Sequence, residues 1–179
     1  MASRGPAPFF LLGCLTIMAL VAGCAPGAPG VPSVSPTATA LPSPSSDLDS
    51  ARQALLTFFT LLHDHRYSEA ANYYGGSYEA LRGWNPSVAP DQAATLLEQG
   101  CTVNGLMCLP IGRVVSEAQL SSTELTFTVE FLNDDGTLFV LGPCCGATEA
   151  EMPPQTQFAY TVSKVGEGFL VQELPVYVP

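Results

Sequence analysis

The tripeptide His63–Asp64–His65 is the strongest candidate for acid–base chemistry in this sequence. Imidazole groups exchange protons near neutral pH, and a neighbouring carboxylate stabilises their charged form. On a continuous helix, however, adjacent residues do not face each other, and residues two apart point about 200° away from each other. The three side chains can converge only if the helix has already ended. The pattern therefore favours a solvated helix end, with a catalytic site as the alternative.

Four cysteines in the second half of the chain, Cys101, Cys108, Cys144 and Cys145, can form disulfides. A hairpin turn at the Asn-Gly pair between Cys101 and Cys108 would place their α-carbons about 5.5 Å apart, which a disulfide can bridge. A bridge between Cys144 and Cys145 would be strained, because consecutive α-carbons lie only about 3.8 Å apart. Crossed pairing between the two pairs would close longer loops and stabilise more. Three alternatives stay open: crossed pairing, a local bridge with a vicinal or free pair, and a four-sulfur metal site, whose spacing matches no common zinc pattern.

Aromatic residues follow the histidines and could line the mouth of a pocket and stack on a ligand: Tyr67, Tyr73, Tyr74, Tyr78 and Trp84. Their helical spacing favours burial in the core instead, because aromatic side chains mostly serve to bury apolar area.

No motif predicts a cofactor or a bound metal. Asp134 and Asp135 could contact calcium, but the following Gly136 indicates a turn, and the ligand pattern of a calcium loop is missing. Phosphate loops, nucleophile elbows and zinc spacings are also missing.

The stretch from Phe9 to Ala22 is apolar, follows a single positive charge at Arg4 and ends at the sequence VAGC. It is shorter than the about 20 residues that a membrane-spanning helix needs, and is typical of a secretion signal. Residues 21–24 resemble the lipobox of bacterial lipoproteins. This resemblance implies cleavage after residue 23 and a lipid anchor on Cys24, and two or more acyl chains suffice for stable membrane attachment.

Three segments follow from this pattern. Residues 1–23 are expected to be a lipoprotein signal peptide, and residues 24–46 a lipidated cysteine with a Pro-, Ser- and Ala-rich tether without an apolar face. Residues 47–179 are expected to form the folded body.

The body changes from a helical to an alternating pattern near Cys108. A long amphipathic helix is predicted from Asp47, and shorter helices follow, the last of them capped by Asp91 and ending at Gly100. Five strands are then predicted, over residues 111–119, 123–132, 137–142, 157–165 and 169–178. Helices first and an antiparallel meander second predict an α+β fold with N-terminal helices packed on one face of a curved antiparallel sheet.

The segment "ARQALLTFFTLLHDHRYSEAANYY" (residues 51–74), followed by the meander, resembles the nuclear transport factor two-like superfamily, an α+β cone. The resemblance covers residues 47–179 and rests on the order of elements. That superfamily contains isomerases, dehydratases and noncatalytic binding domains, so the resemblance selects no chemistry.

The net charge and the expected lipid anchor at Cys24 limit the classes of function that this protein can have. A formal charge of −10 argues against a nucleic-acid partner and against electrostatic attachment to a membrane. We expect a lipid-anchored protein on the extracytoplasmic face of a cell membrane, with a noncatalytic domain that binds a small hydrophobic ligand or an envelope protein. The alternatives are a cone-fold enzyme that uses His63, Asp64 or His65 and, third, a thiol redox or metal protein.

Overall fold

The folded body begins with helix α1 (Pro44–His63), three residues before the predicted start at Asp47. The computed structural model describes residues 44–179. The predicted signal peptide, Cys24 and nearly all of the predicted tether lie outside the described residues. Among the helices of the described part, none is long and apolar enough to cross a membrane.

Helix α1 confirms the predicted amphipathic pattern. Its apolar residues recur at helical spacing and form one fully buried stripe: Ala51, Leu55, Phe58, Phe59 and Leu62. The remaining helical elements are short: α2 (Tyr67–Ala70), the 3₁₀ turn η1 (Ala71–Tyr73), α3 (Glu79–Trp84) and α4 (Ala93–Thr102).

The predicted cap of α4 is wrong. Asp91 lies inside a turn that the Gln92 amide closes by donating to the Ala89 carbonyl, so α4 starts only at Ala93. Gln92 occupies the cap position and makes no side-chain capping hydrogen bond.

Four antiparallel strands follow in the spatial order β1 (Ile111–Gln119), β2 (Glu124–Phe131), β3 (Phe158–Val165) and β4 (Gly168–Val171). The sheet is not closed, because β1 and β4 form its two edges. Two irregularities of register in β1 bend that strand. The alternation predicted for β2 is confirmed, since Leu125, Phe127, Val129 and Phe131 are buried and the residues between them are not.

The fifth strand, predicted over residues 137–142, does not form. Strand β2 is paired with β1 on one edge and with β3 on the other, so neither edge of β2 is free to pair with this segment. Its backbone pairs only through isolated bridges, between Leu132 and Leu138 and between Leu141 and Gln155, while the Phe139 side chain is buried in the core. The last predicted strand is also shorter than expected, because β4 ends at Val171 and the rest of the segment contributes only a bridge from Tyr177 to Leu106.

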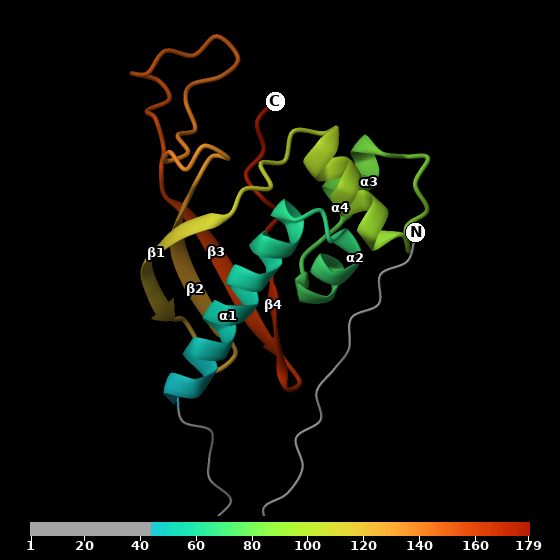
Figure 1. Ribbon diagram of the computed structural model, residues 1–179, viewed down its shortest axis with the longest axis vertical. Helices are drawn as coiled ribbons and strands as arrows, with labels where there is room; N and C mark the ends of the chain where they lie inside the picture. The colour runs from blue at the N-terminus through green and yellow to red at the C-terminus, as the bar shows by residue number, and fades with distance from the viewer. Residues whose placement is uncertain (1–43) are drawn as a thin grey trace, which may run out of the picture. The chain divides into compact units, whose positions relative to one another are not determined.

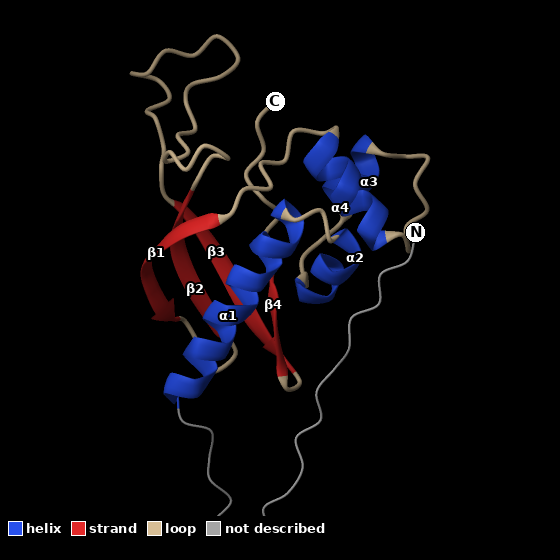
Figure 2. Cartoon of the chain, in the orientation of Figure 1, coloured by secondary structure: helices blue, strands red, loops and turns tan. Residues whose placement is uncertain are grey.

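Helix α1 lies across one face of the sheet, and the shorter helices gather beside its C-terminal end (Figures 1 and 2). Phe59 fills the space between helix and sheet, with its ring centroid 4.9 Å from that of Phe131 and 4.8 Å from that of Tyr160. An ion pair from Lys164 to Asp47, 2.7 Å long, holds the first turns of α1 against the sheet. The helix-facing side of the sheet is thus filled with aromatic side chains.

Candidate functional site

The end of α1 determines where the histidines lie. The Arg66 amide donates to the Leu61 carbonyl at 2.8 Å, and the His65 amide donates to the Leu62 carbonyl at 3.1 Å. This pair of bonds is a Schellman motif, in which the residue after the helix cap adopts the left-handed conformation and is usually glycine. Here that residue is His65, with φ of 59°. Histidine tolerates this region better than most residues, although glycine fits it best.

The left-handed turn brings the His65 ring to Tyr67. The imidazole Nδ1 lies 2.7 Å from the Tyr67 hydroxyl, and the rings meet edge to face with centroids 5.8 Å apart. Burial, together with the negative charge of Glu98, raises the pKa of the Tyr67 phenol above its ordinary value. We therefore assign the phenol as the donor and Nδ1 as the acceptor. This assignment puts the imidazole proton on Nε2, which remains available to a ligand.

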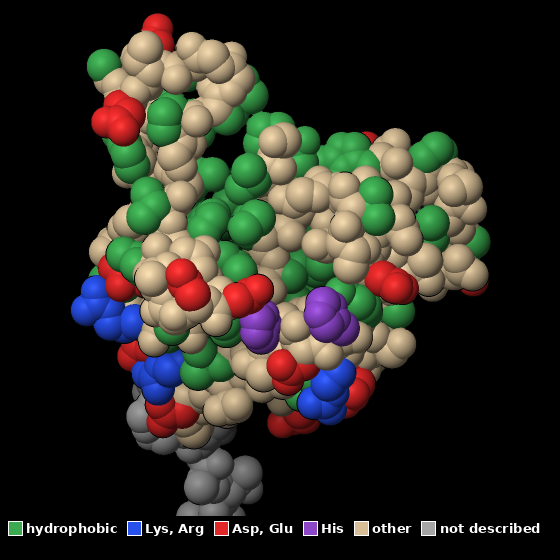
Figure 3. All heavy atoms as spheres, turned by 45° about the horizontal axis from the view of Figure 1, so that its top comes forward, with side chains coloured by type: hydrophobic (Ala, Val, Ile, Leu, Met, Phe, Trp, Pro, Cys, Tyr) green, Lys and Arg blue, Asp and Glu red, His purple; other side chains and the backbone are tan. Residues whose placement is uncertain are grey.

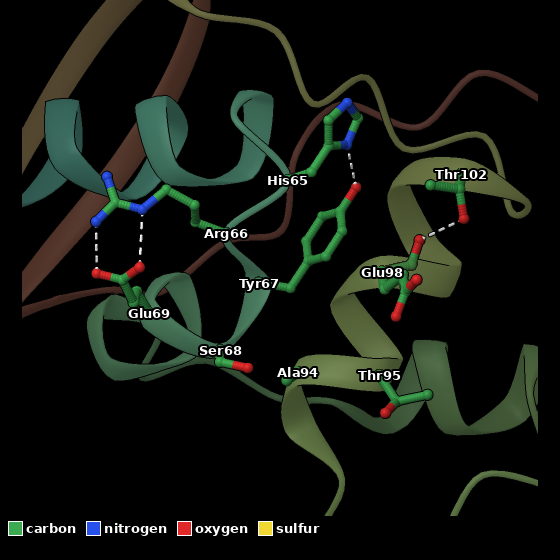
Figure 4. A pocket seen from close by; sticks show the side chains of 9 residues that line it. All are labelled: His65, Arg66, Tyr67, Ser68, Glu69, Ala94, Thr95, Glu98 and Thr102. Atoms are coloured by element: carbon green, nitrogen blue, oxygen red, sulfur yellow. Dashed lines mark hydrogen bonds and ion pairs between the residues drawn. The ribbon is translucent and has the colours of Figure 1, made fainter. Parts of the chain in front are cut away.

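Two hollows adjoin at this pair, and His65 and Tyr67 line both. The larger hollow, of about 590 Å³, lies between α2 and α4 (Figure 4). It is lined mostly by polar residues: His65, Arg66, Tyr67, Ser68, Glu69, Ala94, Thr95, Glu98 and Thr102. The smaller hollow, of about 250 Å³, also includes His63, Asp134 and the Cys101–Cys108 pair. Both chain histidines lie on one face, with acidic side chains near them (Figure 3).

Of the described charged side chains that line the larger hollow, Arg66 and Glu69 form an ion pair and Glu98 does not. Arg66 donates two hydrogen bonds to the Glu69 carboxylate, at 2.7 and 2.6 Å, and these bonds lower the pKa of Glu69. Within the described residues, the Glu98 carboxylate has no such partner, although the Glu98 backbone carbonyl accepts a hydrogen bond from Thr102. The hollow therefore presents an exposed, unpaired carboxylate on α4, across from the Tyr67 ring, as Figure 4 shows.

The structure brings two members of the predicted acid–base tripeptide, His63 and His65, to the smaller hollow and leaves the third outside. His63 lines the smaller hollow and His65 lines both, whereas Asp64 is exposed and lines neither. The residues that face His65 across the larger hollow come from α4. Sequence reasoning missed them, although the spacing of Thr95, Glu98 and Thr102 puts them on one helical face.

Of the open cysteine alternatives, the structure contains the local pairing. Cys101 and Cys108 form a disulfide with α-carbons 5.5 Å apart, so the crossed pairing is absent. The expected hairpin is also absent, because Cys101 still belongs to α4 and the chain turns back only at Gly105, where φ is 81°. The disulfide stiffens a wall of the smaller hollow. Cys144 and Cys145 are free thiols.

The aromatic residues divide between core and surface. Tyr67 and Tyr74 are buried, while Tyr73 and Tyr78 pack against the core from partly buried positions. Trp84 is 41% exposed and stacks on Tyr177, a partner 93 positions away that the sequence did not indicate, with ring centroids 5.0 Å apart.

Comparisons of this chain with protein-family models, with curated proteins and with solved structures found no match.

Proposed function

We propose that the folded body is a binding domain for a small organic cation that also carries a hydrogen-bond acceptor, and that the His65–Tyr67 hollows are its site. The observation that carries this proposal is the position of His65. It occupies a left-handed backbone position suited to glycine, at the junction of two hollows. A residue kept in an unfavourable conformation points to a role for its side chain.

The ligand chemistry follows from the lining of the larger hollow. Glu98 offers an unpaired negative charge, and the formal charge of −10 attracts cations to the protein surface and repels anions. The Nε2 hydrogen of His65 suits a carbonyl or hydroxyl oxygen of the ligand. A volume of about 590 Å³ lies within the usual size of small-molecule sites. The polar lining favours this ligand over the small hydrophobic one that the sequence suggested.

A protein-observed NMR titration of the full chain in detergent micelles tests the proposal, with arginine amide as the probe and citrate as the matched anion. Arginine amide should shift the amide signals around His65 and Glu98, and citrate should not. E98Q should weaken binding a few-fold, since an ion pair to an exposed carboxylate such as that of Glu98 contributes about 0.2–1 kcal/mol. E149Q is the matched control, because Glu149 is exposed on a distant loop. Equal affinities of E98Q and E149Q would refute the proposed site.

The enzyme alternative also depends on His65, since an imidazole bonded to a phenol can transfer protons. It predicts that H65Q abolishes turnover of a bound substrate while leaving its affinity nearly unchanged. The binding proposal predicts loss of affinity instead.

We also propose that the body belongs to the nuclear transport factor two-like cone, supported by the order of helices and strands and by α1 across one face of the sheet. We further propose that the body is held on the extracytoplasmic face of a cell membrane through Cys24. The VAGC sequence at residues 21–24 supports this anchor.

A further inference from the structure

The loop between Leu141 and Gln155 projects from the end of the sheet in both views of the molecule (Figures 1 and 3). Two backbone hydrogen bonds between Leu141 and Gln155, at 2.8 and 2.9 Å, close its base. The loop carries Cys144 and Cys145, the two free thiols of the described residues. These thiols line neither of the His65–Tyr67 hollows, and the binding proposal does not use them.

The backbone presents both thiols on a tight turn. The Ala147 amide donates to the Cys144 carbonyl at 3.0 Å, and the two central residues have positive φ, 61° at Cys145 and 89° at Gly146. Positive φ at both positions defines a type I′ turn, whose first central residue is typically asparagine, aspartate or glycine. Cysteine has no such conformational preference, which indicates a role for the Cys145 side chain.

The two sulfur atoms are already in contact. The Cys145 Sγ donates a hydrogen bond to the Cys144 Sγ, and the two atoms are 2.7 Å apart. Cys145 is exposed and Cys144 is half-buried. Contact with Cys145 raises the pKa of the Cys144 thiol. Cys145 is therefore the better placed of the two to meet a reactant first.

We propose that Cys144 and Cys145 form a thiol–disulfide exchange site that is oxidised by disulfide compounds to a vicinal disulfide. The Cys145 thiolate attacks one sulfur of the oxidant, whose S–S bond breaks and releases one thiolate. The Cys144 thiolate then attacks the Cys145 sulfur, forms the Sγ–Sγ bond and displaces the second oxidant thiolate. Two electrons pass to the oxidant, and the protons of the two cysteines end on its two thiols.

This bridge should be easily reduced again. Consecutive α-carbons lie about 3.8 Å apart, below the usual span of a disulfide, and strained disulfides are the more reducible ones. Cys101 and Cys108, by contrast, have α-carbons 5.5 Å apart and pack against the core. The loop pair should therefore cycle between thiols and disulfide under conditions that leave the Cys101–Cys108 bridge intact.

Tryptic mapping of the full chain separates the two pairs. Cleavage after Arg82, Arg113 and Lys164 puts Cys101 and Cys108 in one peptide, residues 83–113, and Cys144 and Cys145 in another, residues 114–164. The protein is treated with oxidised glutathione, the exchange is stopped with acid, and free thiols are alkylated before digestion. We expect peptide 114–164 to lose two hydrogen atoms and to escape alkylation. Mild dithiothreitol should then restore both of its thiols while peptide 83–113 stays oxidised.

Single variants capture the intermediate. C144S should accumulate a mixed disulfide between Cys145 and glutathione, because the second thiol is missing, and should do so several-fold faster than C145S accumulates one at Cys144. Three results would overturn the proposal: two alkylated thiols in peptide 114–164 after oxidation, two glutathiones on that peptide, or a disulfide linking it to peptide 83–113. The binding test with arginine amide is independent of all of these results.

Discussion

The imidazole Nδ1 of His65 lies 2.7 Å from the hydroxyl of Tyr67, two residues along the chain, in the hydrogen bond that we assign to the phenol as donor. A left-handed backbone at His65 makes this contact possible directly after the end of α1. The pair joins two hollows, so its removal should affect both of them.

Y67F should remove the hydrogen bond and keep the buried ring. We expect a loss of about 0.5–1.5 kcal/mol in the free energy of unfolding, the usual contribution of one hydrogen bond. The nitrogen-15 chemical shifts of the His65 ring should change, because without the Tyr67 hydroxyl Nδ1 no longer accepts this hydrogen bond and the ring proton is no longer held on Nε2. Y73F is the control, because the Tyr73 hydroxyl makes no described hydrogen bond. Unchanged ring shifts in Y67F would contradict the assigned bond.

C24S should move the exported protein from the detergent phase to the aqueous phase in a phase-partition experiment. The reason is that the predicted lipid is attached to this thiol, and electrostatics cannot hold so acidic a chain at a membrane. C14S is the matched control and should stay in the detergent phase. A C24S protein that remained there with its N-terminal segment uncleaved would indicate a membrane-spanning helix instead.

The double variant C101S/C108S should lower the free energy of unfolding by about 2.5 kcal/mol, from the entropy of closing a short loop in the unfolded chain. The two cysteines are separated by seven positions, which makes this contribution smaller than that of a long loop. Urea unfolding measures it. Stability equal to that of the unmodified protein would show that the bridge contributes nothing.

Stability should fall in alkaline solution. Burial, followed by the charge of Glu173, raises the pKa of Tyr160 above its ordinary value of 10.0, and burial does the same for Tyr74. A raised folded-state pKa contributes stability that is complete below the unfolded value and is lost as pH rises beyond it. The free energy of unfolding should therefore be constant with respect to these groups below pH 10 and decline above it.

The measurement is urea unfolding at a series of alkaline pH values. Y160F serves as the comparison, because it keeps the buried ring and removes one titrating group. Its stability should decline less steeply above pH 10 than that of the unmodified protein. Parallel slopes would mean that Tyr160 does not stay protonated in the folded state.

The spacing of apolar residues predicted those helices and strands that bury one apolar face of their own against the core. Helix α1 and strand β2 followed from the spacing of apolar residues, because each buries one side against the core. The segment 137–142 has a similar pattern but forms no strand, since both edges of β2 are already paired. Whether a segment forms a strand depends on whether another segment already pairs with the strand edge beside it. The residues of a single segment do not reveal this.

The candidate site was predicted only in part. The histidines were recognised from their residue type, but the left-handed conformation of His65 was not, because glycine is the usual signal for that position. Glu98 and Thr95 come from α4, about thirty residues further along the chain, and only tertiary packing brings α4 opposite α2. The local cysteine bridge was one of several alternatives, because it left the adjacent Cys144 and Cys145 to a strained bridge or none, whereas crossed pairing would stabilise more. The expected hairpin was wrong, since the turn at Gly105 follows a helix rather than a strand.

The left-handed position after α1, which glycine would fit best, holds His65 because its side chain binds the ligand; this is the central claim. Titration of H65G with arginine amide, followed by NMR, tests it most directly. Glycine fits the left-handed backbone and gains up to about 1 kcal/mol there, whereas loss of the hydrogen bond to Tyr67 costs about 0.5–1.5 kcal/mol, so the two effects should largely offset each other in the free energy of unfolding. Affinity should nevertheless fall about tenfold, because the ligand loses the Nε2 hydrogen bond. An H65G protein that is equally stable and binds arginine amide as tightly as the unmodified chain would contradict the claim.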